Sequence, residues 1–68
     1  MVTLKIKGDH IQLNQLIKAM GWVANGAEAN SVIENRLVKV NGVIELRKRN
    51  KIVQGFKVEF NGQQVEIE

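Results

Sequence analysis

The 68-residue sequence predicts an α+β fold in which two short helices pack on a small, mostly antiparallel sheet. Three observations support this class. Apolar and polar residues alternate near the start of the chain and again in its second half, as they do in half-buried strands. Between these regions, apolar residues recur at helical spacing in two short segments. Two Asn-Gly pairs in the second half are typical of tight hairpin turns.

A strand and a helix are expected at the start of the chain. The strand covers residues 2–7, where every second residue is apolar until a glycine interrupts the pattern. The apolar residues between Leu13 and Met20 follow the i, i+3, i+4, i+7 spacing of an amphipathic helix of about two turns. We expect Asn14 to cap the start of this helix and Gly21 to form its left-handed C-terminal cap.

A second short helix is expected from Gly26 to Asn35. Asn25 and Glu28 have the spacing of a capping box, in which each side chain satisfies a free backbone N–H at the start of a helix. The residues that would face the core from this helix are Ala29, Val32 and Ile33. Because both helices are short, packing against the sheet must stabilise them.

Two hairpins are expected in the second half. Residues 56–67 can turn at Asn61-Gly62, with Val58 opposite Val65, Phe56 opposite Ile67 and Lys57 opposite Glu66, so that register and hydrophobic pattern agree. The other turn, Asn41-Gly42, follows a strand at residues 38–40. A two-residue turn there would pair the polar Lys39 with Ile44 and mix the two faces. We therefore expect an irregular connection after Gly42.

Composition limits the classes of protein that the chain can represent. Its length predicts a single domain over residues 1–68, with a modest core and little room for a deep active site. The absence of cysteine excludes disulfides and thiolate metal sites and is typical of a reducing compartment. No segment has the apolar length of a signal peptide or a membrane span. We expect a cytoplasmic monomer that uses no cofactor and no metal.

The basic residues are unevenly distributed. The net charge is +3, and residues 47–51 hold four of the ten lysines and arginines without an acidic residue. The remaining residues carry six basic and seven acidic side chains. The excess positive charge therefore lies in one local cluster. An arginine can donate two hydrogen bonds to one phosphate, and a lysine adds a mobile positive charge, so this cluster suits phosphate groups. A solvated basic loop without a ligand is the alternative interpretation.

The sequence contains no recognisable catalytic motif. Its few aromatic residues also provide no clear surface for the stacking of bases. His10 is the only histidine, and a surface histidine beside a turn is the simpler interpretation of it. A zinc site would need three or four suitable ligands. Phe56 and Phe60 are expected to pack in the core. The same is expected of Trp22, which lies between the helices, and a stacking platform for a base is the alternative interpretation of this residue. If the basic cluster binds RNA, we expect it to recognise the RNA backbone and shape more than unstacked bases.

Five segments, in order, resemble a known family. They are Ile11–Lys18, Asn25–Ala29, the Val-Lys-Val-Asn-Gly run at residues 38–42, Arg47–Arg49 and Lys51-Ile52. Together they resemble the RNA-binding domain named after small-subunit ribosomal protein S-four, also called the alpha-L motif, in its short stand-alone bacterial form. The resemblance covers about residues 11–58.

The resemblance implies two helices on a small sheet and binding of structured RNA, often ribosomal RNA or the ribosome. Larger relatives carry a catalytic unit, such as a pseudouridine synthase, for which this chain has no remaining residues, so we expect no enzyme. The family binds RNA with the start of its second helix and the adjoining basic strand and loop. Carried over, these positions are Asn25, Gly26, Asn30, Arg36, Lys39, Asn41, Arg47, Lys48, Arg49 and Lys51.

Three positions depart from the family pattern. Relatives often have a basic residue in place of Asn30, which would weaken the contact made by the helix here. They usually have glycine in place of Arg36, which would be mildly strained if that position needs a positive φ and would otherwise add a contact. They usually have Gly-Asp in place of Gly55-Phe56, a change expected to alter a turn.

Two hypotheses follow for the function. The first is a non-catalytic module that docks structured RNA on a basic surface, with ribosomal RNA as the expected target. The second is a protein-interaction module whose basic loop binds an acidic partner, which the sequence does not exclude. A small hydrolase or transferase that depends on His10 is the least favoured alternative.

Overall fold

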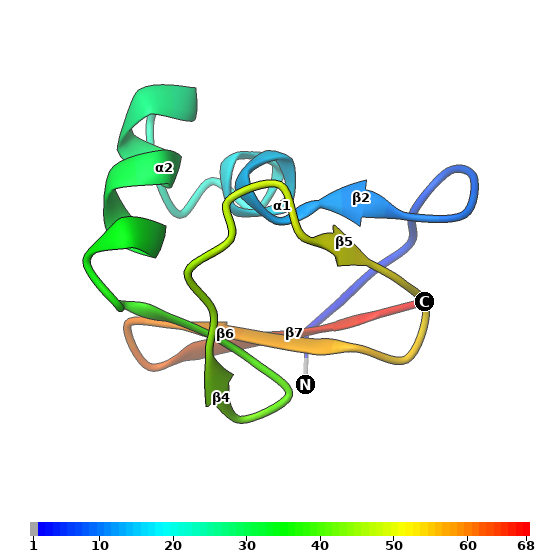
Figure 1. The fold of residues 1–68 in the computed structure, drawn as a ribbon. Helices are drawn as coiled ribbons and strands as arrows, with labels where there is room; N and C mark the ends of the chain where they lie inside the picture. The colour runs from blue at the N-terminus through cyan, green and yellow to red at the C-terminus, as the bar shows by residue number, and fades with distance from the viewer. Residues whose placement is uncertain (1) are drawn as a thin grey trace.

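The computed structural model describes residues 2–68 and places both helices on one side of a five-stranded sheet (Figure 1). The strand order is β1-β7-β6-β3-β4, and β2 and β5 form a separate pair. All pairs are antiparallel except β1 with β7, so the predicted α+β class is confirmed. The elements are β1 (Val2–Leu4), β2 (Ile11–Gln12), α1 (Leu13–Ala19), α2 (Gly26–Glu34), β3 (Val38–Val40), β4 (Val43–Ile44), β5 (Lys51–Ile52), β6 (Lys57–Phe60) and β7 (Gln63–Ile67).

The core lies between the helices and the sheet. Leu13, Leu16 and Ile17 of α1 are fully buried, as are Ala29 and Ile33 of α2. Burial of one such leucine or isoleucine contributes roughly 1.5–3 kcal/mol relative to an exposed side chain. Packing, more than intrinsic propensity, therefore stabilises two helices of seven and nine residues. The sheet covers these side chains with Val38, Val58, Val65 and Ile67.

Helix α1 begins differently from the prediction. Its N-cap is Gln12, which makes no side-chain cap, and Asn14 lies inside the helix. The free N–H groups of the first turn need no side-chain cap, because Leu13 and Asn14 donate theirs to backbone carbonyls of the β4–β5 loop. The other end follows the prediction: Gly21 has φ 73° and closes the helix in the left-handed region.

Helix α2 begins as predicted, and its end explains the position of Arg36. Asn25 accepts the N–H of Glu28 at 2.8 Å, as a capping box requires. The return bond is displaced by one residue, because the Glu28 carboxylate accepts the N–H of Ala24 at 3.0 Å and not that of the N-cap Asn25. Asn35 is the C-cap, and the next residue, Arg36, has φ 64°. Its N–H donates to the carbonyl of Ile33, as in a Schellman motif. Arg36 thus occupies a conformation that favours glycine.

The first strand is shorter than the predicted residues 2–7. β1 ends at Leu4, and Val2 is exposed because β1 is an edge strand. The chain stays beside β7 a little longer, since the N–H of Ile6 donates to the carbonyl of Glu68. It then bends at Gly8 and returns as β2. This two-residue strand is too short to leave a periodic pattern, and the sequence did not predict it.

The prediction of an irregular connection after Gly42 is wrong. Asn41 and Gly42 have φ of 53° and 85°, which is typical of a type I′ turn, and Lys39 pairs directly with Ile44. Pairing a polar with an apolar residue destabilises the sheet little here, because β4 is an edge strand whose side chains are exposed on both faces. Val43, on the same side of the sheet as the core, is 69% exposed.

The second hairpin has the predicted register. Val58 pairs with Val65, and Lys57 with Glu66. Phe60 packs against the core, where its ring centroid lies 6.0 Å from that of Trp22. This confirms the expected packing of the tryptophan against the core.

Candidate nucleic-acid interface

The structure places the predicted site residues in three regions. Asn25, Gly26 and Asn30 belong to the first half of α2 and its cap. Arg47, Lys48, Arg49 and Lys51 belong to the segment of residues 45–51, which we call the basic loop. Figure 1 shows this loop leaving the sheet beside β4 and rising to the start of α1. The third region, along β3 and its flanks, holds Arg36, Lys39 and Asn41.

Asn14 joins the first two regions. Its backbone N–H donates to the carbonyl of Lys48 at 3.0 Å, and its side-chain Nδ2 donates to Oδ1 of Asn30 at 3.0 Å. A further bond, from the N–H of Leu13 to the carbonyl of Asn50, also 3.0 Å long, fixes the loop against the same turn of α1. The basic loop and the first half of α2 therefore share one support.

Glu45 braces the basic loop from inside. Its carboxylate accepts Nε of Arg47 at 3.0 Å, Nη2 of Arg47 at 3.2 Å and the backbone N–H of Arg47 at 2.9 Å. The same carboxylate accepts Nδ2 of Asn50 at 3.1 Å. The side-chain hydrogen bond from Arg47 lowers the pKa of Glu45 and raises the pKa of Arg47. These contacts tie the middle of the loop to its first residue.

The ion pair changes the charge that the loop presents. The side chain of Arg47 is 76% exposed, but its fork already binds Glu45. Among residues 2–68, this is the one ion pair within 4.0 Å. Lys48, Arg49 and Lys51 are exposed and make no such pair. These three are the cations best placed to meet a phosphate.

Two predicted contact residues have local structural partners. The side-chain oxygen of Asn25 accepts the N–H of Glu28 and so caps α2. Asn41 exchanges hydrogen bonds with Lys57 of β6, in which its N–H donates to the carbonyl at 2.7 Å and its Oδ1 accepts the N–H at 2.9 Å. Asn25 caps a helix and Asn41 stabilises a hairpin turn, so only their remaining polar atoms can face a ligand.

Arg36 and Lys39 are not brought together with the start of α2. Arg36 follows the C-terminal end of the helix, about 15 Å along its axis from Gly26 at the rise of an α-helix. Lys39 points away from the helices, because its neighbours Val38 and Val40 face the core. It lies opposite Glu59 of β6. These two cations lie at the margin of any surface centred on the basic loop.

The sequence did not predict the roles of Asn14, Glu45 and Asn50. Asparagine is a residue type typical of an N-cap, which is the role predicted for Asn14. Its bond to Asn30 spans sixteen positions in the sequence, which no local pattern reveals. Glu45 lies two residues before Arg47 in a loop without regular secondary structure. No helical or strand periodicity there indicates that the two side chains are in contact. The one signal in the sequence that could have identified this contact is an acidic residue two positions before the basic run.

Other kinds of site receive no support from residues 2–68. No group of three His, Asp or Glu side chains in this range is arranged to hold a metal ion. In the same range, no helix has the length and apolar character needed to cross a bilayer.

Comparison with known proteins identifies relatives of the chain. The model of the family described as "S4 domain" matches residues 4–68. YbcJ of Escherichia coli (strain K12), named as a candidate RNA-binding protein, is 44% identical over 61 residues, which cover 90% of this chain and 87% of that protein. YbcJ of Shigella flexneri, described as uncharacterised, matches with the same identity and coverage. The solution structure of E. coli YbcJ, described as revealing an alpha-L motif involved in RNA binding, has a TM-score of 0.74 and 43% identity and covers 98% of this chain and 86% of that one.

Proposed function

The chain belongs to the S4 domain family, and we propose that it is a non-catalytic protein that binds structured RNA through its basic loop and the first half of α2. The proposed contacts centre on Lys48, Arg49 and Lys51, with Asn30 and Gly26 beside them. Asn25, Arg36, Lys39, Asn41 and Arg47, which the family resemblance implies, are proposed as supporting or marginal positions.

The observation that carries this proposal is the attachment of the basic loop to α1. The loop is fixed by two backbone hydrogen bonds to the first turn of that helix and by the Glu45 brace. A loop whose backbone is already fixed loses less conformational entropy on binding than a mobile loop that carries the same lysines and arginines. A preorganised cluster of cations suits the repeating phosphates of a folded RNA.

Two further observations concern the ligand and the way in which it is recognised. The relative YbcJ is described in terms of RNA binding, and its structure aligns with nearly the whole of this chain. Trp22, Phe56 and Phe60 pack against the core, which favours recognition of backbone and shape. Within this class we propose ribosomal RNA as the target and a monomer, folded as one domain over residues 1–68, as the binding unit.

The test is a titration of the protein with structured ribosomal RNA fragments and with matched duplex DNA at two salt concentrations. We expect tighter binding to RNA, with an affinity that falls as salt rises because counterions are released from phosphates. Equal affinity for RNA and DNA would contradict specific recognition of RNA. Absence of binding to both would contradict the proposed function.

A protein partner with an acidic surface is the second candidate. Its support is the presence of exposed apolar side chains at the basic loop and next to it: Leu46 lies within the loop, and Val43 and Ile44 lie on opposite faces of the adjoining β4. Apolar side chains next to cations suit an acidic, partly apolar peptide more than a phosphate backbone. Capture of partners with and without ribonuclease separates the two candidates, because only recovery through RNA is lost on treatment.

A further inference from the structure

A surface hollow lies between α1 and the N-terminal arm, which we define as residues 4–11. Its volume of about 390 Å³ is within the range of small-ligand sites. Half of its lining residues are aliphatic, among them Ile6 and Ile11. The polar lining consists of Lys5, Lys7, His10 and Gln15. None of these residues belongs to the RNA-binding positions proposed above.

The lining has the chemistry that a nucleotide requires. The two lysines suit a phosphate, and the amide of Gln15 can donate to and accept from a base edge or a ribose hydroxyl. The flat ring of His10 can stack on a base, as histidines do with unstacked bases of RNA. Whereas Trp22, Phe56 and Phe60 pack against the core, His10 is exposed.

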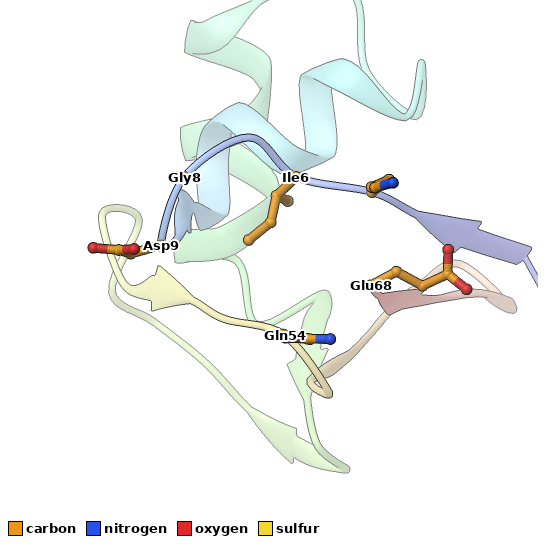
Figure 2. A pocket seen from close by; sticks show the side chains of 6 residues that line it. Ile6, Gly8, Asp9, Gln54 and Glu68 are labelled. Carbon is orange, nitrogen blue, oxygen red and sulfur yellow. The ribbon is translucent and has the colours of Figure 1, made fainter.

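A neighbouring hollow of about 420 Å³ differs in the charge of its lining. Figure 2 shows this neighbouring hollow, with Asp9 and Glu68 among its lining residues. It shares Lys5 and Ile6 with the first but is also lined by Asp9 and Glu68. Two carboxylates against one ammonium group repel a phosphate. The hollow beside α1 instead has two lysines and no acidic residue in its lining.

The hollow beside α1 also adjoins the basic loop. β2 directly follows His10, and its Gln12 pairs with Lys51 of the loop. On the helix, Gln15 follows Asn14, whose backbone N–H is bonded to Lys48. An RNA strand that leaves the loop can therefore reach the hollow along the start of α1.

We propose that this hollow binds one unpaired nucleotide that flanks the structured RNA held by the basic loop. The phosphate lies between Lys5 and Lys7, and the base stacks on His10. This inference rests on the proposed function and narrows its ligand to a hairpin or duplex that carries an unpaired extension.

The test compares the affinity of the whole chain for one RNA hairpin in two forms, blunt or with a short oligoadenylate extension at either end. We expect the extension on one end to tighten binding by about fivefold to tenfold, as expected for one stacked base. Lys7→Gln and His10→Ala should each remove most of this gain and leave the affinity for the blunt hairpin within about twofold. Lys57→Gln, which removes an equal charge from the far face of the sheet, is the matched control and should keep the full gain.

The outcomes separate this inference from the function on which it rests. If the extension gives no gain, or if Lys7→Gln leaves the gain intact, the nucleotide site is overturned while RNA binding by the loop stands. If neither hairpin binds, both proposals are overturned. Replacement of the adenines by abasic sites should abolish most of the gain, and a gain fully retained would overturn the stacking of a base on His10.

Discussion

Asn14 and Asn30 connect the two helices through one hydrogen bond, in which Nδ2 of Asn14 donates to Oδ1 of Asn30 at 3.0 Å. Oδ1 of Asn14 is buried and has no partner among the described residues. A buried acceptor without a partner costs about 1–3 kcal/mol, which offsets the net contribution of the bond to Asn30. The asparagine side chain is best explained by its bond to Asn30, since the bond to the basic loop comes from the backbone N–H of residue 14.

Replacement of both asparagines should reveal this coupling. In a double-mutant cycle of Asn14→Ala and Asn30→Ala, we expect a coupling free energy of about 0.5–1.5 kcal/mol, the net contribution of one hydrogen bond. Urea unfolding of the four proteins measures it. Additive effects of the two substitutions would mean that the bond contributes nothing to the packing of α1 on α2.

Arg47 and Arg49 should differ in their effects although both lie in the basic loop. Arg49→Gln removes a cation without an ion-pair partner, so it should weaken RNA binding and lower the salt dependence by about one counterion without loss of stability. Arg47→Gln also releases the Glu45 brace and should lower the thermal stability as well. Binding titrations at several salt concentrations, together with thermal melts, distinguish the two.

The matched control for these variants is Lys57→Gln, because Lys57 is exposed on the face of the sheet that turns away from the helices. An equal loss of affinity in the control would show that net charge alone decides binding. The same melting temperature for both arginine variants would argue against the brace.

Arg36→Gly should stabilise the protein. Arg36 has φ 64°, and a non-glycine residue in this region carries strain of roughly 1–2 kcal/mol. Part of the gain is offset because glycine has more freedom in the unfolded chain, so we expect an increase of about 0.5–1 kcal/mol in the free energy of unfolding. Chemical denaturation measures this change, with Arg36→Lys as the control that keeps both charge and strain. RNA affinity should change by less than about twofold, because Arg36 lies beyond the far end of α2.

Acid should remove the stabilisation that Glu45 contributes. The pKa of Glu45 is lower in the folded protein than its ordinary value of 4.5. Its carboxylate therefore stabilises the fold above pH 4.5, and this contribution is lost as the pH falls through the lower pKa of the folded state. Glu45→Gln lacks the contribution at every pH. Thermal melts from neutral to acid pH should show wild type more stable than Glu45→Gln near neutrality and the two converging in acid.

Much of the fold followed from the sequence because its signals are local. The capping box at Asn25, the glycine at position 21 and the register of the β6–β7 hairpin each depend on residues a few positions apart. The hydrophobic period likewise placed Leu16, Ile17 and Ile33 in the core. Short elements such as β2 and β4 were missed or misjudged, because two residues carry no period and an edge strand tolerates mixed faces.

The sequence by itself determined the fold class, both helices and the identity of a basic cluster, since composition and periodicity are properties of neighbouring residues. Only the tertiary structure decided how that cluster is presented. It showed that Glu45 engages Arg47, that Asn14 holds the loop beside Asn30, and that Lys39 faces away from both. Hydrogen bonds between distant segments form where packing brings their backbones together, and no local pattern records that geometry.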